Sequence, residues 1–395
     1  MTTDFLSKGE MMKIRTGNPV RGENFFVRKH LIDKVWEQIE SENHLLLVAP
    51  RRVGKTSLMF YLIDNPKKNY YFLFLDTESV NSENEFYKKL LSKLLTSEFV
   101  KGKDKFFSFI KEHSPAIKNI STNGVEFNTK QELNYFVEFQ KIIEKLELEN
   151  SRLIILLDEF SQTVENIKKD ESERNAIHFL QTNRELRQTI SKKVQFVYSG
   201  SIGLENIVKG LNAMNTINDI APIKVKPLNN REAKEFISKL LLNVDYELNE
   251  SLIEYILHKI EWLIPFYLQL TIQAIKDLSK EENIFEITED VIDKSFREMI
   301  EQRNYFEHWH TRLKTLFKAN EYNFAKELLN IISESESIPS NDIYDLAIKH
   351  KLEKKYKDIV GSLVYDGYIN NNDDVKIYRY NSPILRMWWW KYVTN

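Results

Sequence analysis

Residues 44–58, HLLLVAPRRVGKTSL, constrain the fold of this chain more than any other segment. An apolar run ends in a short basic turn, and Gly54-Lys55-Thr56 then leads into a second apolar run, SLMFYLI. A buried strand, a tight turn and a helix in this order surround a phosphate with backbone N–H groups and the positive end of the helix. The segment therefore predicts a phosphate-binding loop between a strand and a helix.

Each part of this loop has an expected role. Gly54 permits a close backbone approach, Lys55 reaches the β- and γ-phosphates, and the Thr56 hydroxyl coordinates Mg²⁺. The candidate cofactor-binding residues here are Ala49, Pro50, Arg51, Arg52, Val53, Gly54, Lys55, Thr56 and, as a secondary contact, Ser57. Alanine at position 49 replaces the first glycine of the Walker A pattern. The alternative, a chance Gly-Lys-Thr in a surface turn, is disfavoured by the apolar segments on both sides.

The segment LIILLDE at 153–159, an apolar run that ends in Asp-Glu, has the arrangement of a Walker B strand. Asp158 is expected to hold Mg²⁺, directly or through water, and Glu159 to act as the general base for the attacking water. Asp76, which ends the run YYFLFLD, is a rival for the Mg²⁺ role. It ranks lower because no glutamate follows it directly.

Two further catalytic roles have less specific candidates. Ser199 is the first choice and Ser201 the second for a polar residue that senses the γ-phosphate at the end of the run VYSGSIGL; the alternative is a strand end that needs small residues to turn. Arg184 and Arg187, in FLQTNRELRQ, are candidates for neutralising transition-state charge, and we retain Arg187. A solvated helix face is the competing and favoured interpretation of both arginines.

Five apolar runs with helical segments between them predict an α/β domain with a parallel sheet. The expected strands lie at 45–49, 70–76, 153–158, 194–200 and 222–228, and the expected helices at 56–63, 82–97, 131–148 and 172–190. A polar leader at 1–24 comes before them, and residues 98–130 are expected to be an insertion with some helix and no assigned function.

The pattern changes after Pro227, and we expect three domains. These are a nucleotide-binding core at 1–228, a helical lid at 229–307 and a winged helix at 308–395. Helices predicted at 322–335, 340–350 and 353–366 are followed by short strands around a polar NNDD turn, which is the order of a winged helix.

Composition limits the classes of function. The net charge is -2, with 56 basic and 58 acidic residues, which disfavours a constitutive nucleic-acid binder. The absence of cysteine excludes thiol catalysis and cysteine zinc sites, and it fits a reducing cytoplasm. The chain has no apolar run of the ~18–20 residues that cross a bilayer, and its start lacks a secretory core. We therefore expect a cytoplasmic protein that does not contact membranes.

Several motifs together resemble the prokaryotic AAA family ATPases of the archaeal-ATPase type, which belong with the STAND class of P-loop NTPases near the Orc/Cdc6-like AAA+ proteins. The motifs are GNPVRGENFFVRKHLIDKVW, LLLVAPRRVGKTSLM, LIILLDEF, VYSGSIGL, WLIPFYLQL and YRYNSPILRMWWW. The resemblance implies an AAA+-like three-layer core, a helical lid and a winged-helix tail, with ATP and Mg²⁺ as cofactors. It also implies a Mg-dependent ATP hydrolase.

The same resemblance suggests where the base of the nucleotide binds. Phe26, Val27 and Arg28 would line the adenine site, and Pro265 of the lid motif WLIPFYLQ would lie against the base. Val27, Lys29 and Leu263 depart from the usual motifs. No arginine stands in this lid motif, so a lid arginine that senses the γ-phosphate is not assigned, which favours a slow switch over a fast motor. Considered without the resemblance, Pro265 could simply start a core helix.

The expected function is an ATP-driven regulatory switch that acts on a partner protein or a DNA-associated process. Self-association is also expected to be possible. One alternative is a DNA-binding initiator- or loader-like protein that uses a modest basic stripe, formed by Lys354, Lys355, Lys357, Lys376 and Arg379. Another is a nucleotide-stabilised scaffold that does not hydrolyse ATP. The three adjacent tryptophans, Trp388–390, cannot all face one core because neighbours on a helix point about 100° apart. The favoured interpretation is that they pack between domains.

Overall fold

The computed structural model describes residues 12–100, 104–114, 117–121, 124–128, 133–148, 150–190 and 193–395. Parts of the predicted leader and of the predicted insertion therefore lie outside the described residues. The chain divides into two compact units. The sheet unit comprises Val27–Val48 and Lys55–Val225, and the helical unit comprises Met1–Phe26, Ala49–Gly54 and Lys226–Asn395. The expected domain boundaries at 228 and 307 stay predictions.

A five-stranded sheet forms the centre of the sheet unit, in the order β2-β5-β6-β1-β7. Every neighbouring pair of strands in this sheet is parallel. The strands are β1 (His44–Val48), β2 (Tyr70–Asp76), β5 (Arg152–Asp158), β6 (Val194–Ser199) and β7 (Ile220–Lys224). The α/β architecture predicted from the five apolar runs is confirmed.

Burial explains which strands the sequence predicts well. The central strands β5 and β6 are buried along their length apart from Arg152, which is why their apolar runs are continuous. The edge strand β7 begins two residues before the predicted 222–228 and tolerates Pro222, since an edge strand needs hydrogen bonds on one side only. β7 ends at Lys224. The Val225 N–H still donates to the Val48 carbonyl at 2.9 Å, and the chain then enters the helical unit at Lys226.

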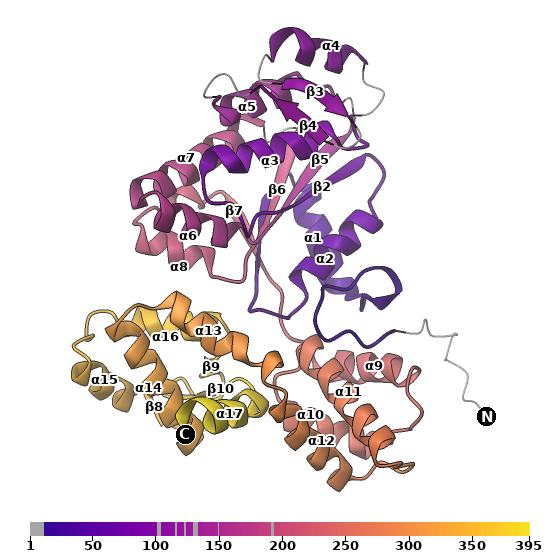
Figure 1. Cartoon of the computed structure of the whole chain (residues 1–395), viewed down its shortest axis with the longest axis vertical. Coiled ribbons are helices and arrows are strands. Elements are labelled where there is room, and N and C mark those ends of the chain that lie inside the picture. Colours follow the sequence, from indigo (N-terminus) through magenta and orange to yellow (C-terminus); the bar gives the residue numbers. More distant parts are fainter. Residues whose placement is uncertain are drawn as a thin grey trace. The chain divides into compact units, whose positions relative to one another are not determined.

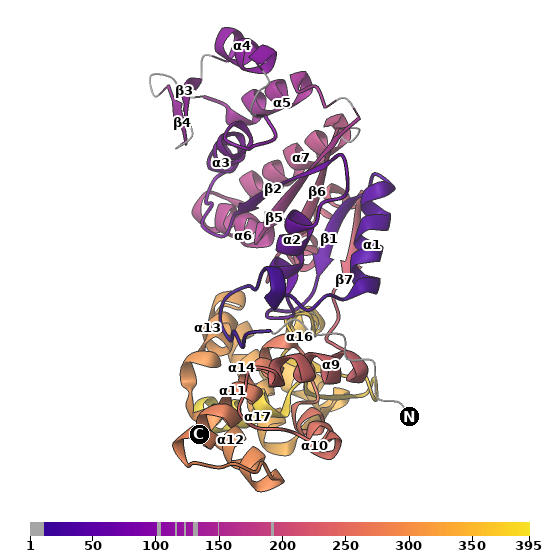
Figure 2. The same ribbon diagram turned by 90° about the vertical axis from the view of Figure 1, so that its right-hand side faces the viewer.

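Helices pack against the strands (Figure 2), and the four predicted helical segments correspond to α2, α3, α5 and α7, whereas α6 and α8 were not predicted. Contacts link α1 to β1, α2 and α3 to β2, and α6 and α7 to β6. The bounds are α1 (Lys29–Glu40), α2 (Lys55–Asp64), α3 (Glu83–Leu95), α5 (Tyr135–Lys145), α6 (Phe160–Asp170), α7 (Glu173–Ile190), α8 (Leu204–Gly210) and the short η2 (Met214–Thr216). The predicted helix at 131–148 starts at Tyr135 because the Asn134 side chain caps it by accepting from the Val137 N–H.

The predicted insertion contains more than helix. It forms α4 (Asp104–His113) and a hairpin of β3 (Ile117–Ser121) and β4 (Gly124–Phe127), which was not predicted. These elements lie beside α3 and α5 (Figure 1).

The helical unit begins with η1 (Gly22–Asn24) and continues after the sheet unit with a run of helices. These are α9 (Asn230–Leu241), α10 (Glu250–Ile260), α11 (Pro265–Glu281), α12 (Glu289–Glu301), η3 (Arg303–Tyr305) and α13 (Glu307–Leu316). No helix in the described part of the chain is long and apolar enough to span a bilayer.

The last part of the helical unit combines helices with a small sheet. Its elements are α14 (Asn320–Ser335), β8 (Ser337–Pro339), α15 (Ser340–Lys349), α16 (Tyr356–Tyr365), β9 (Ile369–Asn370), β10 (Ile377–Tyr380), α17 (Pro383–Trp389) and the terminal turn Trp390–Thr394. The strands are antiparallel in the order β8-β10-β9. The sequence predicts each helix of this segment and the β9–β10 hairpin, but it does not predict β8.

The three adjacent tryptophans occupy different environments, as their helical spacing requires. Trp388 and Trp389 are fully buried, and the Trp388 ring stacks on Phe306 with centroids 5.9 Å apart. Trp390 is 48% exposed. The tail helix is therefore anchored by two of its tryptophans within the helical unit.

Candidate active site

A buried carboxylate lies at the carboxyl end of β5. Asp158 is 5% exposed, and the Thr56 hydroxyl donates to its Oδ2 at 2.6 Å. The Ser199 hydroxyl donates to its other oxygen, Oδ1. Burial raises the pKa of Asp158, although the hydrogen bonds from Ser199 and Thr56 and the charge of Lys55 act in the opposite direction. The structure therefore brings together the predicted metal ligands and the first-choice sensor.

The topology explains why these residues meet. Strands β5, β6 and β1 are neighbours and run in parallel, so their carboxyl ends lie at one edge of the sheet. Asp158 ends β5, Ser199 ends β6, and Thr56 lies in the first turn of the helix that follows β1. Ligands of open α/β sheets bind at this edge.

Glu159 is held by Ser201. Both the N–H and the hydroxyl of Ser201 donate to Oε2 of Glu159, at 2.8 Å and 2.7 Å. Glu159 has φ 55° and ψ 30°, a left-handed conformation that is uncommon for a residue other than glycine. The two candidate sensor serines thus have different partners, because Ser199 bonds Asp158 and Ser201 bonds Glu159.

Gly200 separates these serines, and its position requires glycine. A Cβ at this position would lie 1.7 Å from the Ser161 Oγ. A larger residue would therefore push the end of β6 away from the first turn of α6.

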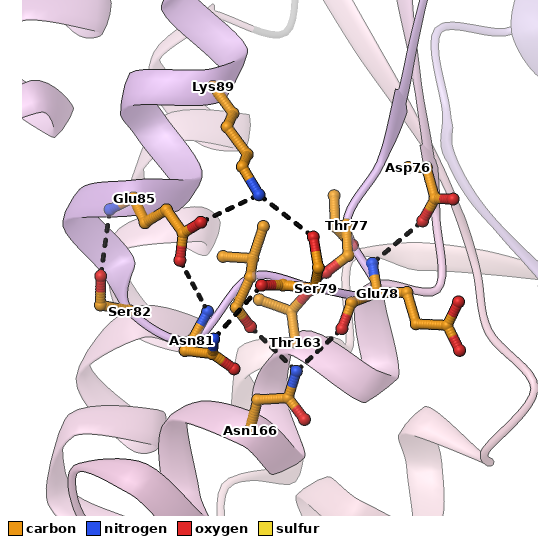
Figure 3. Close-up of polar contacts among 11 residues, drawn as sticks. Asp76, Thr77, Glu78, Ser79, Asn81, Ser82, Glu85, Lys89, Thr163 and Asn166 are labelled. Carbon is orange, nitrogen blue, oxygen red and sulfur yellow. Dashed lines mark hydrogen bonds and ion pairs between the residues drawn. The ribbon is translucent and has the colours of Figure 1, made fainter.

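The loop that follows β2 supports the same edge of the sheet (Figure 3). The N–H and hydroxyl of Thr77 donate to the Asp158 carbonyl at 3.0 Å and 2.9 Å. Thr163 in α6 donates to the Thr77 carbonyl at 2.7 Å, and Asn166 donates to the Glu78 carbonyl at 2.9 Å. The helix that starts after Glu159 is therefore fastened to a neighbouring loop. Sequence reasoning missed these residues, and the signal available was a run of short polar side chains after a strand.

The far end of this loop is tied to α3. Glu85 accepts from the Asn81 N–H at 3.0 Å and pairs with Lys89 at 2.9 Å, while Ser82 caps the helix (Figure 3). Asp76, the rival for the metal role, accepts from the Glu78 N–H at 3.0 Å, so its carboxylate shapes the turn. Its exposed side chain does not join the Thr56–Asp158 contact.

The phosphate loop contributes residues to both units. Lys55, 7% exposed, and the buried Ser57 begin α2 in the sheet unit. The residues before them pack within the helical unit: Ala49, Pro50, Arg51, Arg52, Val53 and Gly54. Gly54 has φ 103°, which explains the need for glycine before the lysine.

The residues predicted to line the base site have mixed environments. Phe26 is buried and makes an edge-to-face contact with Phe236 at 5.3 Å between centroids. Val27 is 48% exposed, and Arg28 directly precedes α1. Pro265 occupies the first turn of α11, so it does start a helix. A role of these residues in adenine binding stays a prediction.

Arg187 has a partner that the sequence did not reveal. It is 2% exposed, and its Nε and Nη2 donate to the two oxygens of Asp219, each at 2.8 Å. Burial opposes the charge, yet Tyr198 and Asp219 raise the pKa of Arg187. Asp219 directly precedes β7, at the amino end of the strands, so the structure does not bring Arg187 to Asp158 or Glu159. Arg187 does not lie on a solvated helix face either.

The described part of the chain contains no group of three or more His, Asp or Glu side chains that could hold a metal by itself. The metal candidates are therefore the two ligands of the Walker motifs, Thr56 and Asp158, which touch each other.

No protein-family model and no curated protein sequence matches the chain. Solved structures do match it. A Walker-type ATPase of Pyrococcus abyssi is 18% identical, with 95% of this chain and 97% of that chain covered and a TM-score of 0.64. The ORC2 protein of Aeropyrum pernix, solved as ADPNP–ADP complexes, is 12% identical, with 95% of each chain covered and a TM-score of 0.57. The chain has the fold of the Orc/Cdc6-like AAA+ ATPases, as the sequence resemblance predicted.

Proposed function

We propose that this protein binds ATP with Mg²⁺ at the phosphate loop and hydrolyses it slowly, as a regulatory switch of the AAA+/STAND type. The observation that carries the proposal is the convergence of Thr56, Ser199 and Asp158, with Glu159 held beside them. The fold supports it, because the similar Aeropyrum pernix protein was solved with the nucleotides ADPNP and ADP.

The donor set fits Mg²⁺, which prefers oxygen ligands and is commonly held by one or two protein groups plus phosphates. Thr56 and Asp158 offer a hydroxyl and a carboxylate in contact. Burial raises the pKa of Asp158, and a nearby cation favours the ionised form. When bound, Mg²⁺ neutralises phosphate charge and so assists phosphoryl transfer.

The residues of the chain would divide the remaining work. Gly54 and Lys55 would bind the β- and γ-phosphates. Ser201 occupies Oε2 of Glu159 with two hydrogen bonds, which leaves Oε1 to accept a proton from water. Ser199 would orient Asp158 and, after rotation of its hydroxyl, contact the γ-phosphate.

The switch is proposed to regulate a partner protein, and this partner can also be a second copy of the chain. The order of α14, β8, α15, α16, β9 and β10 supports a winged helix, a module that binds DNA in some proteins and protein in others. Two residues of the predicted basic stripe already have acidic partners. Arg379 bonds Glu261 and Asp373 at 2.5 Å and 2.6 Å, and Lys355 bonds Glu321 at 2.9 Å. We therefore favour a protein partner over DNA.

Isothermal titration with ATP and Mg²⁺, together with a turnover assay, tests the proposal. Lys55→Ala is expected to abolish measurable binding, whereas Glu159→Gln keeps binding and loses turnover by about 10²–10⁴-fold. Unchanged binding in Lys55→Ala would contradict the nucleotide site. Unchanged turnover in Glu159→Gln, with binding intact, would favour the scaffold alternative.

DNA binding can be tested separately by gel shift at low and high salt. If Lys354, Lys355, Lys357 and Arg379 are replaced by glutamine and a salt-sensitive shift is lost, the initiator-like alternative is supported. We expect no shift in the unmodified protein.

A further inference from the structure

Arg52, the second arginine of the phosphate loop, has an unusual backbone and an unusual neighbour. Its φ of 64° lies in the left-handed region, which side-chain-bearing residues adopt only where their surroundings fix it. Its guanidinium carbon lies 3.8 Å from the centre of the Phe266 ring. Phe266 is 6% exposed and is the second residue of α11.

The remaining contacts of Arg52 do not include an acidic partner. Its Nη1 donates to the Thr16 carbonyl at 3.4 Å. Among the residues that the structure describes, no carboxylate pairs with Arg52, and the groups that influence its charge are Tyr267, Arg51 and Tyr305. Burial lowers the pKa of Arg52, as expected for a buried cation that lies against an aromatic ring instead of an anion. The face of Phe266, at 3.8 Å, is therefore the closest ring contact that the structure gives this guanidinium.

Pro50, two residues earlier, is also closely packed in the helical unit. Gly367, after α16, has φ 85°, and a Cβ on it would lie 3.0 Å from the Pro50 Cβ and 2.5 Å from Trp262 Cη2. The close approach of Gly367 thus limits the space around Pro50, while Phe266 packs against Arg52. Residues of the helical unit outside the loop therefore contact its first half and help to fix its conformation.

We propose that Arg52 is a positioning residue that fastens the phosphate loop to α11 through Phe266, and so prepares Gly54 and Lys55 for the nucleotide. This inference rests on the proposed nucleotide site. It assigns Arg52 a task other than that of a phosphate ligand. It also makes nucleotide affinity depend on Phe266, a residue without charge or hydrogen-bonding groups.

The test measures the Kd of ATP with Mg²⁺ for the full chain by titration calorimetry, after circular dichroism confirms the fold of each variant. Phe266→Leu removes the ring face and keeps an apolar side chain, and we expect its Kd to rise about three- to tenfold. Phe266→Tyr keeps the face and should bind nearly as the wild type does. Phe285→Leu is the matched control because Phe285 is 90% exposed in the same unit, and its Kd should not change.

A double-mutant cycle with Arg52→Met identifies the contact itself. If Arg52 acts through Phe266, Arg52→Met combined with Phe266→Leu should bind no worse than the weaker single variant, because both changes break one interaction. Effects that multiply, or a wild-type Kd in folded Phe266→Leu, would overturn the inference. A wild-type chain that binds no ATP would instead contradict the proposed function.

Discussion

Two aspartates at opposite ends of the same sheet differ in what surrounds them: Asp158 is buried, whereas the Asp219 side chain is 25% exposed. Asp219, before β7, faces the guanidinium of Arg187, which lowers its pKa although burial acts in the opposite direction. Asp158, at the end of β5, accepts hydrogen bonds from the Thr56 and Ser199 hydroxyls, and burial raises its pKa. The Asp219 carboxylate is paired with the Arg187 guanidinium. The Asp158 carboxylate accepts hydrogen bonds from two hydroxyls, and within the described part of the chain no cation lies in ion-pair contact with it, although the Lys55 charge lowers its pKa.

This is the difference expected between a structural site and a functional one. An ion pair whose hydrogen bonds are complete, such as Arg187–Asp219, needs nothing further. A buried carboxylate whose pKa is raised gains from an added cation, and such perturbed groups cluster at functional sites. The comparison predicts a large loss of stability on substitution at the Arg187–Asp219 pair and a small one at Asp158.

The largest expected effect is a loss of stability at the Arg187–Asp219 ion pair. Arg187→Ala removes a buried guanidinium with its hydrogen bonds to Asp219, Tyr198 and the Thr216 carbonyl, and it should lower the free energy of unfolding by about 2–3 kcal/mol. Urea denaturation followed by circular dichroism measures this. Arg174→Ala, at an exposed position of the same helix, is the control and should change stability by less than about 0.5 kcal/mol. A similar loss in both variants would remove the distinction between the two sites.

Ser201→Ala should act on turnover more than on stability. It removes one of the two hydrogen bonds that hold Glu159, so we expect the rate of ATP hydrolysis to fall about tenfold, with the Kd of ATP unchanged. Ser201→Thr keeps the hydroxyl and should retain most of the rate. An equal loss in the alanine and threonine variants would mean that packing, and not the hydrogen bond, matters at this position.

Asp158→Asn should hardly change the stability of the nucleotide-free protein. The amide avoids the burial penalty of the charge and keeps one acceptor, so the free energy of unfolding should shift by about 1 kcal/mol or less. Asp219→Asn is the matched change at the Arg187–Asp219 ion pair, and it should lower the free energy of unfolding clearly more. Equal losses in urea denaturation would contradict the interpretation of Asp158 as an incomplete site.

The smallest expected effect is a difference in pH dependence between pH 7 and pH 5. Asp158, whose pKa is raised above the ordinary 3.8, contributes stability that is present at low pH and lost as the pH rises through the folded-state pKa. Asp219, whose pKa is lowered, keeps its contribution throughout this interval and loses it only at lower pH. The stability of the wild type relative to Asp158→Asn should therefore fall slightly as the pH rises. The difference for Asp219→Asn should stay constant.

The sequence predicts those parts of the molecule that depend on local patterns. Continuous apolar runs predicted β5 and β6 because both faces of these strands are buried. The Gly-Lys-Thr and Asp-Glu motifs predicted that Thr56 and Asp158 belong to one site, and the structure brings these two side chains into contact.

Features that depend on distant residues could not be predicted in this way. Arg187 and Asp219 are 32 residues apart, and nothing near Arg187 identifies its partner. Thr163 lies 86 residues from the Thr77 carbonyl that it bonds. The β3–β4 hairpin was missed for a different reason, since its strands are short, partly exposed and polar, and they resemble a loop.

The burial pattern of the tail turns the tryptophans into an optical reporter. The chain has six tryptophans, and Trp36, Trp262, Trp309, Trp388 and Trp389 are all buried, whereas Trp390 is 48% exposed. A water-soluble quencher such as iodide should therefore dim the emission of Trp390 selectively. Any molecule that covers the end of the chain would shield this emission, so docking could be followed without attaching a dye.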